Sequence, residues 1–126
     1  MPQPKLSRAE LRIMKALWER GPSSVREVHE TFPEKRRPAY TTVQTMLYRL
    51  EVKNAVKRAK RIGGAHIFEA LVSRNAAEHK VIDDLLELFG GRAQPLMSRL
   101  IEAGKLTLAD IEEAQSILRK TTRSDK

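Results

Sequence analysis

The chain has 126 residues, of which 40% are hydrophobic and 32% are charged, and its formal net charge at pH 7 is +8. This length allows one domain or two small ones. The lack of cysteine excludes disulfides, thiolate metal sites and thiol redox chemistry. No stretch approaches the roughly 18 apolar residues of a membrane span, and the N-terminus has no apolar run of signal-sequence length. The chain is therefore expected to be cytoplasmic, with no membrane insertion.

The first two helices are predicted by two Ser-x-x-Glu sequences with capping-box spacing, which begin at Ser7 and Ser24. The first helix carries apolar residues at helical spacing and is expected to stop at Gly21. The second helix is short and is expected to run through Phe32. Both predictions rest on local signals alone.

A third helix and a β-hairpin follow a loop rich in Lys and Arg. Residues 40 to about 53 indicate the helix, and residues 55–61 and 66–72 indicate two strands. The intervening Ile62-Gly63-Gly64-Ala65 is a plausible hairpin turn. The expected order is helix, helix, helix, hairpin.

The net charge of the chain is concentrated in this same region. Residues 35–61 contain nine of the 24 basic residues and a single acid, Glu51, so this window carries a net charge of +8. The rest of the chain sums to zero. A focused positive field favours a polyanionic partner such as nucleic acid, although basic runs are commonly only solvated surfaces.

The third helix has one apolar face and one polar face. On a helical wheel Val43, Leu47 and Leu50 form the buried face. The opposite side carries hydroxyls, an amide and a guanidinium, and has no carboxylate before Glu51: Thr41, Gln44, Thr45, Tyr48 and Arg49. Such groups can hydrogen-bond base edges or phosphate oxygens. The alternative is an ordinary solvated face, but such faces normally include Glu and Asp.

The hairpin adds four cations in five residues, Lys57, Arg58, Lys60 and Arg61. A basic hairpin directly after a DNA-reading helix is typical of the wing of a winged helix-turn-helix, which reaches the adjacent minor groove or backbone. The alternative is a charged edge that only discourages aggregation. We favour the wing, since four cations exceed what edge protection needs.

Three further helices are expected after Ser73. The first covers residues 75–89, the second ends at Gly104, and the third is capped by Thr107. Some fifty residues cannot bury all the large apolar side chains of these helices, so a second subunit is their natural cover. We therefore predict two domains, residues 1–72 for DNA binding and residues 73–126 for dimerisation. The residues predicted to form the dimer are Val81, Ile82, Leu85, Leu86, Leu88, Phe89, Leu96, Leu100, Ile111 and Leu118.

Four parts of the chain carry a family resemblance. They are RPAYTTVQTMLYRL (37–50), LSRAELRIMKALWERG (6–21), the wing, and the Gly-Gly-spaced C-terminal helices. From about Leu6 to Leu118 the chain resembles the penicillinase-repressor family. The resemblance implies an N-terminal winged helix, a C-terminal helical dimerisation domain, and homodimers that occupy palindromic operators and repress resistance or sensor genes. By position, it implies DNA contacts at Thr41, Thr42, Gln44, Thr45 and Arg49, of which Thr42 is added by the resemblance.

The resemblance also bears on how repression is relieved. Copper-responsive members carry a cysteine-rich motif, so copper sensing is not expected here. In β-lactam-responsive members, proteolysis occurs at a bond that aligns near Arg99 and Leu100, which implies a membrane sensor protease as a partner. The Asn-Phe pair found at that bond in some members is missing from this chain.

The predicted fold is mainly α, with a small β-hairpin wing, and the predicted function is that of a DNA-binding repressor acting as a homodimer. The three histidines lack metal-ligand spacing and no activated nucleophile is evident, so neither an enzyme nor a metal or other cofactor is expected. Two alternatives stay open. One is a winged-helix regulator whose C-terminal half binds a small ligand, and the other is an adaptor whose basic surface binds an acidic protein.

Overall fold

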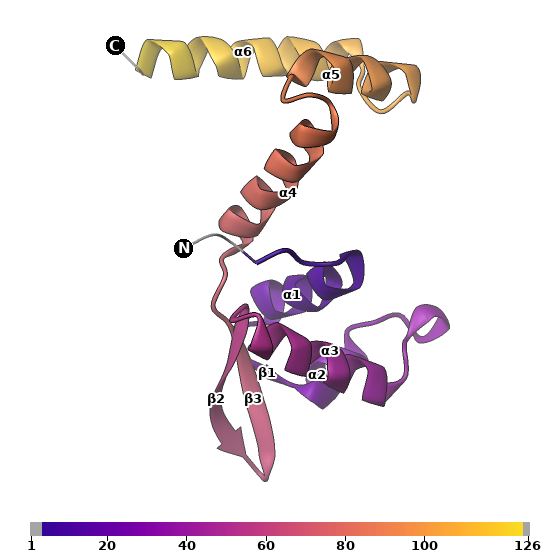
Figure 1. Cartoon of the computed structure of the whole chain (residues 1–126), viewed down its shortest axis with the longest axis vertical. Helices are drawn as coiled ribbons and strands as arrows, with labels where there is room; N and C mark the ends of the chain where they lie inside the picture. The colour runs from indigo at the N-terminus through magenta and orange to yellow at the C-terminus, as the bar shows by residue number, and fades with distance from the viewer. Residues whose placement is uncertain (1–3, 125–126) are drawn as a thin grey trace. The chain divides into compact units, whose positions relative to one another are not determined.

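The computed structural model describes residues 4–124, with side chains through Thr122. The ends of the two predicted domains, residues 1–3 and 125–126, lie outside the described residues. Helices dominate, with three short strands (Figure 1). In chain order the elements are α1 (Arg8–Arg20), β1 (Ser23–Ser24), α2 (Val25–Glu30), the 3-10 turn η1 (Glu34–Arg36), α3 (Tyr40–Val52), β2 (Val56–Ile62), β3 (Ala65–Ala70), α4 (Arg74–Leu88), α5 (Ala93–Glu102) and α6 (Leu108–Ser124). The predicted mainly α fold with one hairpin is confirmed.

Both predicted capping boxes are present. The backbone N–H of Ser7 donates to Glu10 Oε1 over 2.8 Å and that of Glu10 donates to Ser7 Oγ over 3.1 Å. Ser24 and Glu27 repeat the pattern at 3.0 and 3.1 Å. Each box satisfies two backbone donors that a helix start otherwise leaves unpaired. Helix α2 ends at Glu30, two residues before the predicted end at Phe32.

Strand β1 was not predicted from the sequence. Its two serines pair with Phe68 and Ile67 of β3, so the sheet has three antiparallel strands in the order β1-β3-β2. A strand of two residues has no alternation of apolar and polar residues. It exists because the end of α1 brings Ser23 and Ser24 beside β3.

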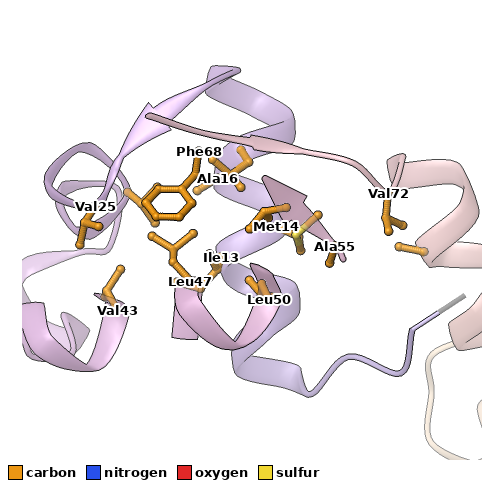
Figure 2. Packing of buried hydrophobic residues seen from close by; sticks show 14 residues of the cluster. Ile13, Met14, Ala16, Val25, Val43, Leu47, Leu50, Ala55, Phe68 and Val72 are labelled. Carbon is orange, nitrogen blue, oxygen red and sulfur yellow. The ribbon is translucent and has the colours of Figure 1, made fainter. Parts of the chain in front are cut away.

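One apolar core joins α1, α2, α3 and the base of the hairpin. Ile13 and Met14 of α1, Leu47 of α3 and Phe68 of β3 are each 0% exposed, and Figure 2 shows their side chains pointing toward one another. The predicted buried face of α3 is confirmed, since Val43 and Leu50 are buried as well. The core therefore fixes which face of α3 is turned to the outside.

The hairpin extends beyond α1, α2 and α3 (Figure 1). Asn54, with φ of 63°, turns the chain from α3 into β2, and Gly63 and Gly64, with φ of 58° and 84°, form the turn between the strands. A positive φ costs glycine little, which explains the Gly-Gly pair at the tip. The strands lie within one or two residues of their predicted bounds.

The chain divides into two compact units, one up to Val81 and one from Ile82, so α4 contributes to both. In the first unit the Trp18 indole N–H donates to the Val72 carbonyl over 2.9 Å and so anchors the segment before α4 on α1. In the second unit Thr107 caps α6 as predicted, with its Oγ1 accepting from the Asp110 N–H over 3.2 Å. The functional division at residues 72/73 stays a prediction. Among the described residues, no helix has the length and apolarity needed to cross a bilayer.

Candidate nucleic-acid interface

The outward face of α3 carries the side chains that the sequence assigned to it. Thr41, Thr42, Thr45 and Arg49 are exposed, Tyr48 is 39% exposed, and Gln44 is half-buried. Glu51 follows at the C-terminal end of the helix and is half-buried. The face is therefore a surface of hydroxyl, amide and guanidinium groups, as the helical wheel predicts.

The loop before α3 is held by side chains whose role the sequence did not reveal. His29 Nε2 lies 2.9 Å from the Pro38 carbonyl oxygen, and its ring meets that of Tyr40 edge-on at 5.7 Å between centroids. Arg37 donates to the carbonyls of Phe32 and Glu30 over 3.0 and 3.2 Å. Arg37 thus fixes the loop that leads into α3, a role that the sequence analysis did not assign to it.

The C-terminal end of α3 is tied to the start of α1. Lys53 Nζ lies 2.7 Å from Glu10 Oε1, and it also donates to the Lys5 carbonyl over 3.0 Å. Burial raises the pKa of Glu10, but the hydrogen bonds from Lys53 and Ser7 outweigh it, so the net pKa lies below its ordinary value. Glu10 is thus a buried carboxylate at the junction of α1 and α3, and Lys53 is its partner.

The wing cations fall into two groups. Lys57 Nζ pairs with Glu69 Oε1 across the strands at 3.1 Å, and Arg58 Nε pairs with Glu51 Oε2 at 3.0 Å. The second group lies nearer the tip: among the described residues Lys60 has no ion pair, and Arg61 donates to the carbonyl of Gly64 over 3.0 Å. The sequence-based count treated all four alike. The hairpin register, which places Lys57 opposite Glu69, could have predicted the first pair.

Nine of the ten residues predicted to form a dimer lie on α4, α5 and α6, and Phe89 lies in the turn directly after α4. None of the ten is buried. Leu88 is 83% exposed and Leu118 is 66% exposed, whereas Leu100 and Ile111 are half-buried. In the predicted cleavage pair, Arg99 is exposed and its guanidinium lies 3.7 Å from the Glu102 carboxylate. Within the described residues, no three of His, Cys, Asp and Glu lie together as a metal site would require.

Three helices with a two-stranded wing and a short third strand define this chain as a winged-helix protein. A family model described as penicillinase repressor matches residues 6–120, and the chain belongs to that family. The resemblance stated from the sequence is thereby confirmed.

Two comparisons with individual proteins agree with this assignment. The transcriptional regulator BlaI of Mycobacterium tuberculosis, present in two strains, is 41% identical over 75 residues, which cover 55% of this chain and 54% of the relative. The chain thus spans about half the length of the curated relatives it matches. The solution structure of the monomeric form of Bacillus licheniformis BlaI with the blaP half-operator is 28% identical and superposes with a TM-score of 0.50, covering 60% of this chain and 90% of that one.

A more distant structure shares the fold alone. Apo MarR of E. coli is 16% identical and has a TM-score of 0.51, covering 93% of this chain and 78% of that one. This likeness agrees with the winged-helix fold of this chain and shows no more than a shared fold.

Proposed function

We propose that this chain is a sequence-specific DNA-binding transcriptional repressor that acts as a homodimer in the cytoplasm. The observation that carries the proposal is the outward face of α3, whose exposed polar groups lie beside a basic wing. The relatives support it, since one is named a transcriptional regulator and the other was solved with a half-operator. The proposal assigns the chain no enzymatic activity.

In this proposal α3 enters the major groove and the wing follows the backbone. Gln44 and Thr45 are the side chains we assign to base edges, because amide and hydroxyl groups discriminate among donor and acceptor patterns. Lys60 and Arg61 are assigned to phosphates, because neither is paired with an acid within the described residues. Phosphate contacts then supply the salt-dependent part of the affinity and α3 supplies specificity.

The proposal of a homodimer is supported by the apolar surface of the second half. Exposed large side chains on α4 and α6, including Ile82 at 51%, Leu88 at 83% and Leu118 at 66%, would be costly to leave in water. A two-fold dimer presents two copies of α3 to a palindromic operator. Linking two half-sites raises the affinity through effective concentration, without a new DNA contact.

Relief of repression by proteolysis between Arg99 and Leu100 is the most detailed part of the proposal. This bond lies inside α5, three residues before the helix ends at Glu102. A protease needs an extended substrate, so the last turn of α5 must first open locally. The exposed Arg99–Glu102 pair opposes this opening only weakly. Cutting there would separate α6 from α4 and remove part of the proposed dimer surface.

The first experiment is selection from a pool of random duplexes with the full chain, followed by footprinting. We expect a palindrome whose half-sites lie about one helical turn apart, or a small multiple of it. Recovery of no preferred sequence would refute the proposal and would favour the adaptor that binds an acidic protein.

The homodimer is tested with Leu88→Glu, which places a carboxylate in the exposed apolar surface of α4. Asn75→Glu adds the same charge at an exposed polar position of the same helix and serves as the matched control. Sedimentation should give a monomer for Leu88→Glu and a dimer for Asn75→Glu, with operator binding weakened only in the former. A dimeric Leu88→Glu variant that holds the operator like the parent would exclude this surface.

A further inference from the structure

Arg58 is the wing cation most closely held by the body of the domain. Its Nε lies 3.0 Å from Glu51 Oε2, and the exposed fractions of the two side chains are 37% and 34%. Its guanidinium carbon lies 5.1 Å from the centroid of the Tyr48 ring and 5.6 Å from that of Phe68. Arg58 therefore contacts the end of α3 through its charge and two aromatic rings through its planar face.

These contacts connect the core to the outward face of α3. Phe68 is 0% exposed, and its ring lies 6.4 Å from that of Tyr48, so one side of the cluster is fixed in the core. On the other side the Tyr48 hydroxyl accepts a hydrogen bond from Gln44 Nε2 over 3.0 Å. Tyr48 thus contacts both Arg58 and Gln44 and connects the two side chains.

Arg58 also lies where the direction of the wing is set. The register of β2 on β3 shifts between Arg58 and Lys60, which marks a bulge at Ala59. Bulges bend a strand and increase its twist, so the bulge next to Arg58 affects the direction of the tip. Lys60 and Arg61 lie beyond the bulge on the exposed part of the hairpin. The Arg58–Glu51 pair thus joins the wing to α3 directly before the bulge.

A phosphate contact by Arg58 would have to compete with Glu51. The competition concerns Nε, the nitrogen that is paired with Glu51, and a guanidinium that turned away to present Nε to a phosphate would give up this carboxylate and its contacts with the two rings. The single acid within the basic window of residues 35–61 is thus bound to one of the wing cations, whereas Lys60 has no such partner among the described residues. Partly exposed ion pairs add little to the free energy of unfolding. The Arg58–Glu51 pair is therefore better explained by the position in which it holds the Arg58 side chain.

We propose that Arg58 is a positioning residue, which holds the wing tip and the Tyr48–Gln44 pair in one arrangement and so sets discrimination between operator and random DNA. The inference rests on the proposed DNA-binding function and refines it. Glu51 takes part as the carboxylate that holds the Arg58 guanidinium. Arg58 then contributes to specificity without being one of the phosphate contacts that give the affinity its salt dependence.

The test compares Glu51→Gln and Arg58→Lys with the parent on the selected operator and on a random duplex of equal length, over a series of salt concentrations. Both variants should lower the ratio of operator to random affinity about tenfold, which lies within the range that one poorly placed base contact costs. The salt dependence should keep its slope. Lys60→Gln is the matched control and should weaken both DNAs while flattening the slope by about one unit per subunit.

A direct phosphate contact by Arg58 gives the opposite results. Glu51→Gln would then release the guanidinium and strengthen binding to both DNAs, and Arg58→Lys would bind like the parent. Either outcome would overturn the proposal.

A second measurement needs no DNA and separates this inference from the proposed function. Amide relaxation of residues 60–65 by NMR in the free protein should show a more mobile wing tip in Glu51→Gln and Arg58→Lys than in Lys60→Gln. An unchanged tip refutes the positioning role even if the parent selects an operator. If the parent selects none, the proposed function fails and the NMR comparison still decides whether Arg58 holds the wing.

Discussion

The ion pair between the buried Glu10 and the partly exposed Lys53 yields a quantitative prediction about stability. Lys53→Met keeps most of the aliphatic stem and removes the ammonium group 2.7 Å from Glu10 Oε1. The Glu10 side chain is 6% exposed and that of Lys53 is 36% exposed. Removing one partner of a fully buried pair costs about 3–5 kcal/mol, and a hydrogen bond to a charged group contributes about 1.5–3 kcal/mol. Because Lys53 is partly solvated, we expect a loss of about 2 kcal/mol.

The same pair predicts how this loss depends on pH. The folded-state pKa of Glu10 is lowered, so its contribution to the free energy of unfolding is fully present above its ordinary pKa near 4.5. The contribution is lost as the pH falls through the lower folded-state pKa. Lys53→Met lacks the hydrogen bond that lowers this pKa. The difference in stability between parent and variant should therefore shrink between pH 5 and strongly acidic conditions.

Urea unfolding followed by circular dichroism measures both effects, at matched protein concentrations because dimerisation adds to apparent stability. Lys35→Met is the control, since Lys35 is an exposed lysine with no ion pair among the described residues. It should unfold like the parent. Equal stability of Lys53→Met and the parent at pH 7, or a difference that stays constant into acid, would refute this account of Glu10.

Three further predictions concern α3 and the wing. Leu47→Ala empties a site that is 0% exposed and should cost about 2–5 kcal/mol; a variant that melts like the parent yet loses DNA binding would contradict this. Lys60→Gln with Arg61→Gln should weaken binding to every sequence and flatten its salt dependence by roughly one unit per lost contact in each subunit, as a filter-binding salt series measures; an unchanged slope would exclude phosphate contacts there. Gln44→Ala should cost about 1–3 kcal/mol on the operator but little on random DNA, and equal losses on both would place Gln44 outside base recognition.

The elements of the first half could be predicted from the sequence because their signals are local. A capping box needs two residues three positions apart, as at Ser7 and Glu10, and both boxes are present. The buried face of α3 follows from the helical period of Val43, Leu47 and Leu50. The concentration of charge in residues 35–61 is a property of composition along the chain. These features were enough to predict the fold class and the face of α3 that is turned outward.

The Lys57–Glu69 pair follows from the register of the hairpin, but two other pairings in this region depend on tertiary structure. Lys53 meets Glu10 from 43 positions away in the chain, and Arg58 meets Glu51 beside the rings of Tyr48 and Phe68. Strand β1 likewise exists only because Ser23 and Ser24 lie against β3. A sequence pattern reports periodicity within one element, whereas an ion pair between elements depends on how the core packs them to within a few ångströms. For that reason the sequence revealed a basic surface, and the fold distinguished the cations bound to acids from those left facing the solvent.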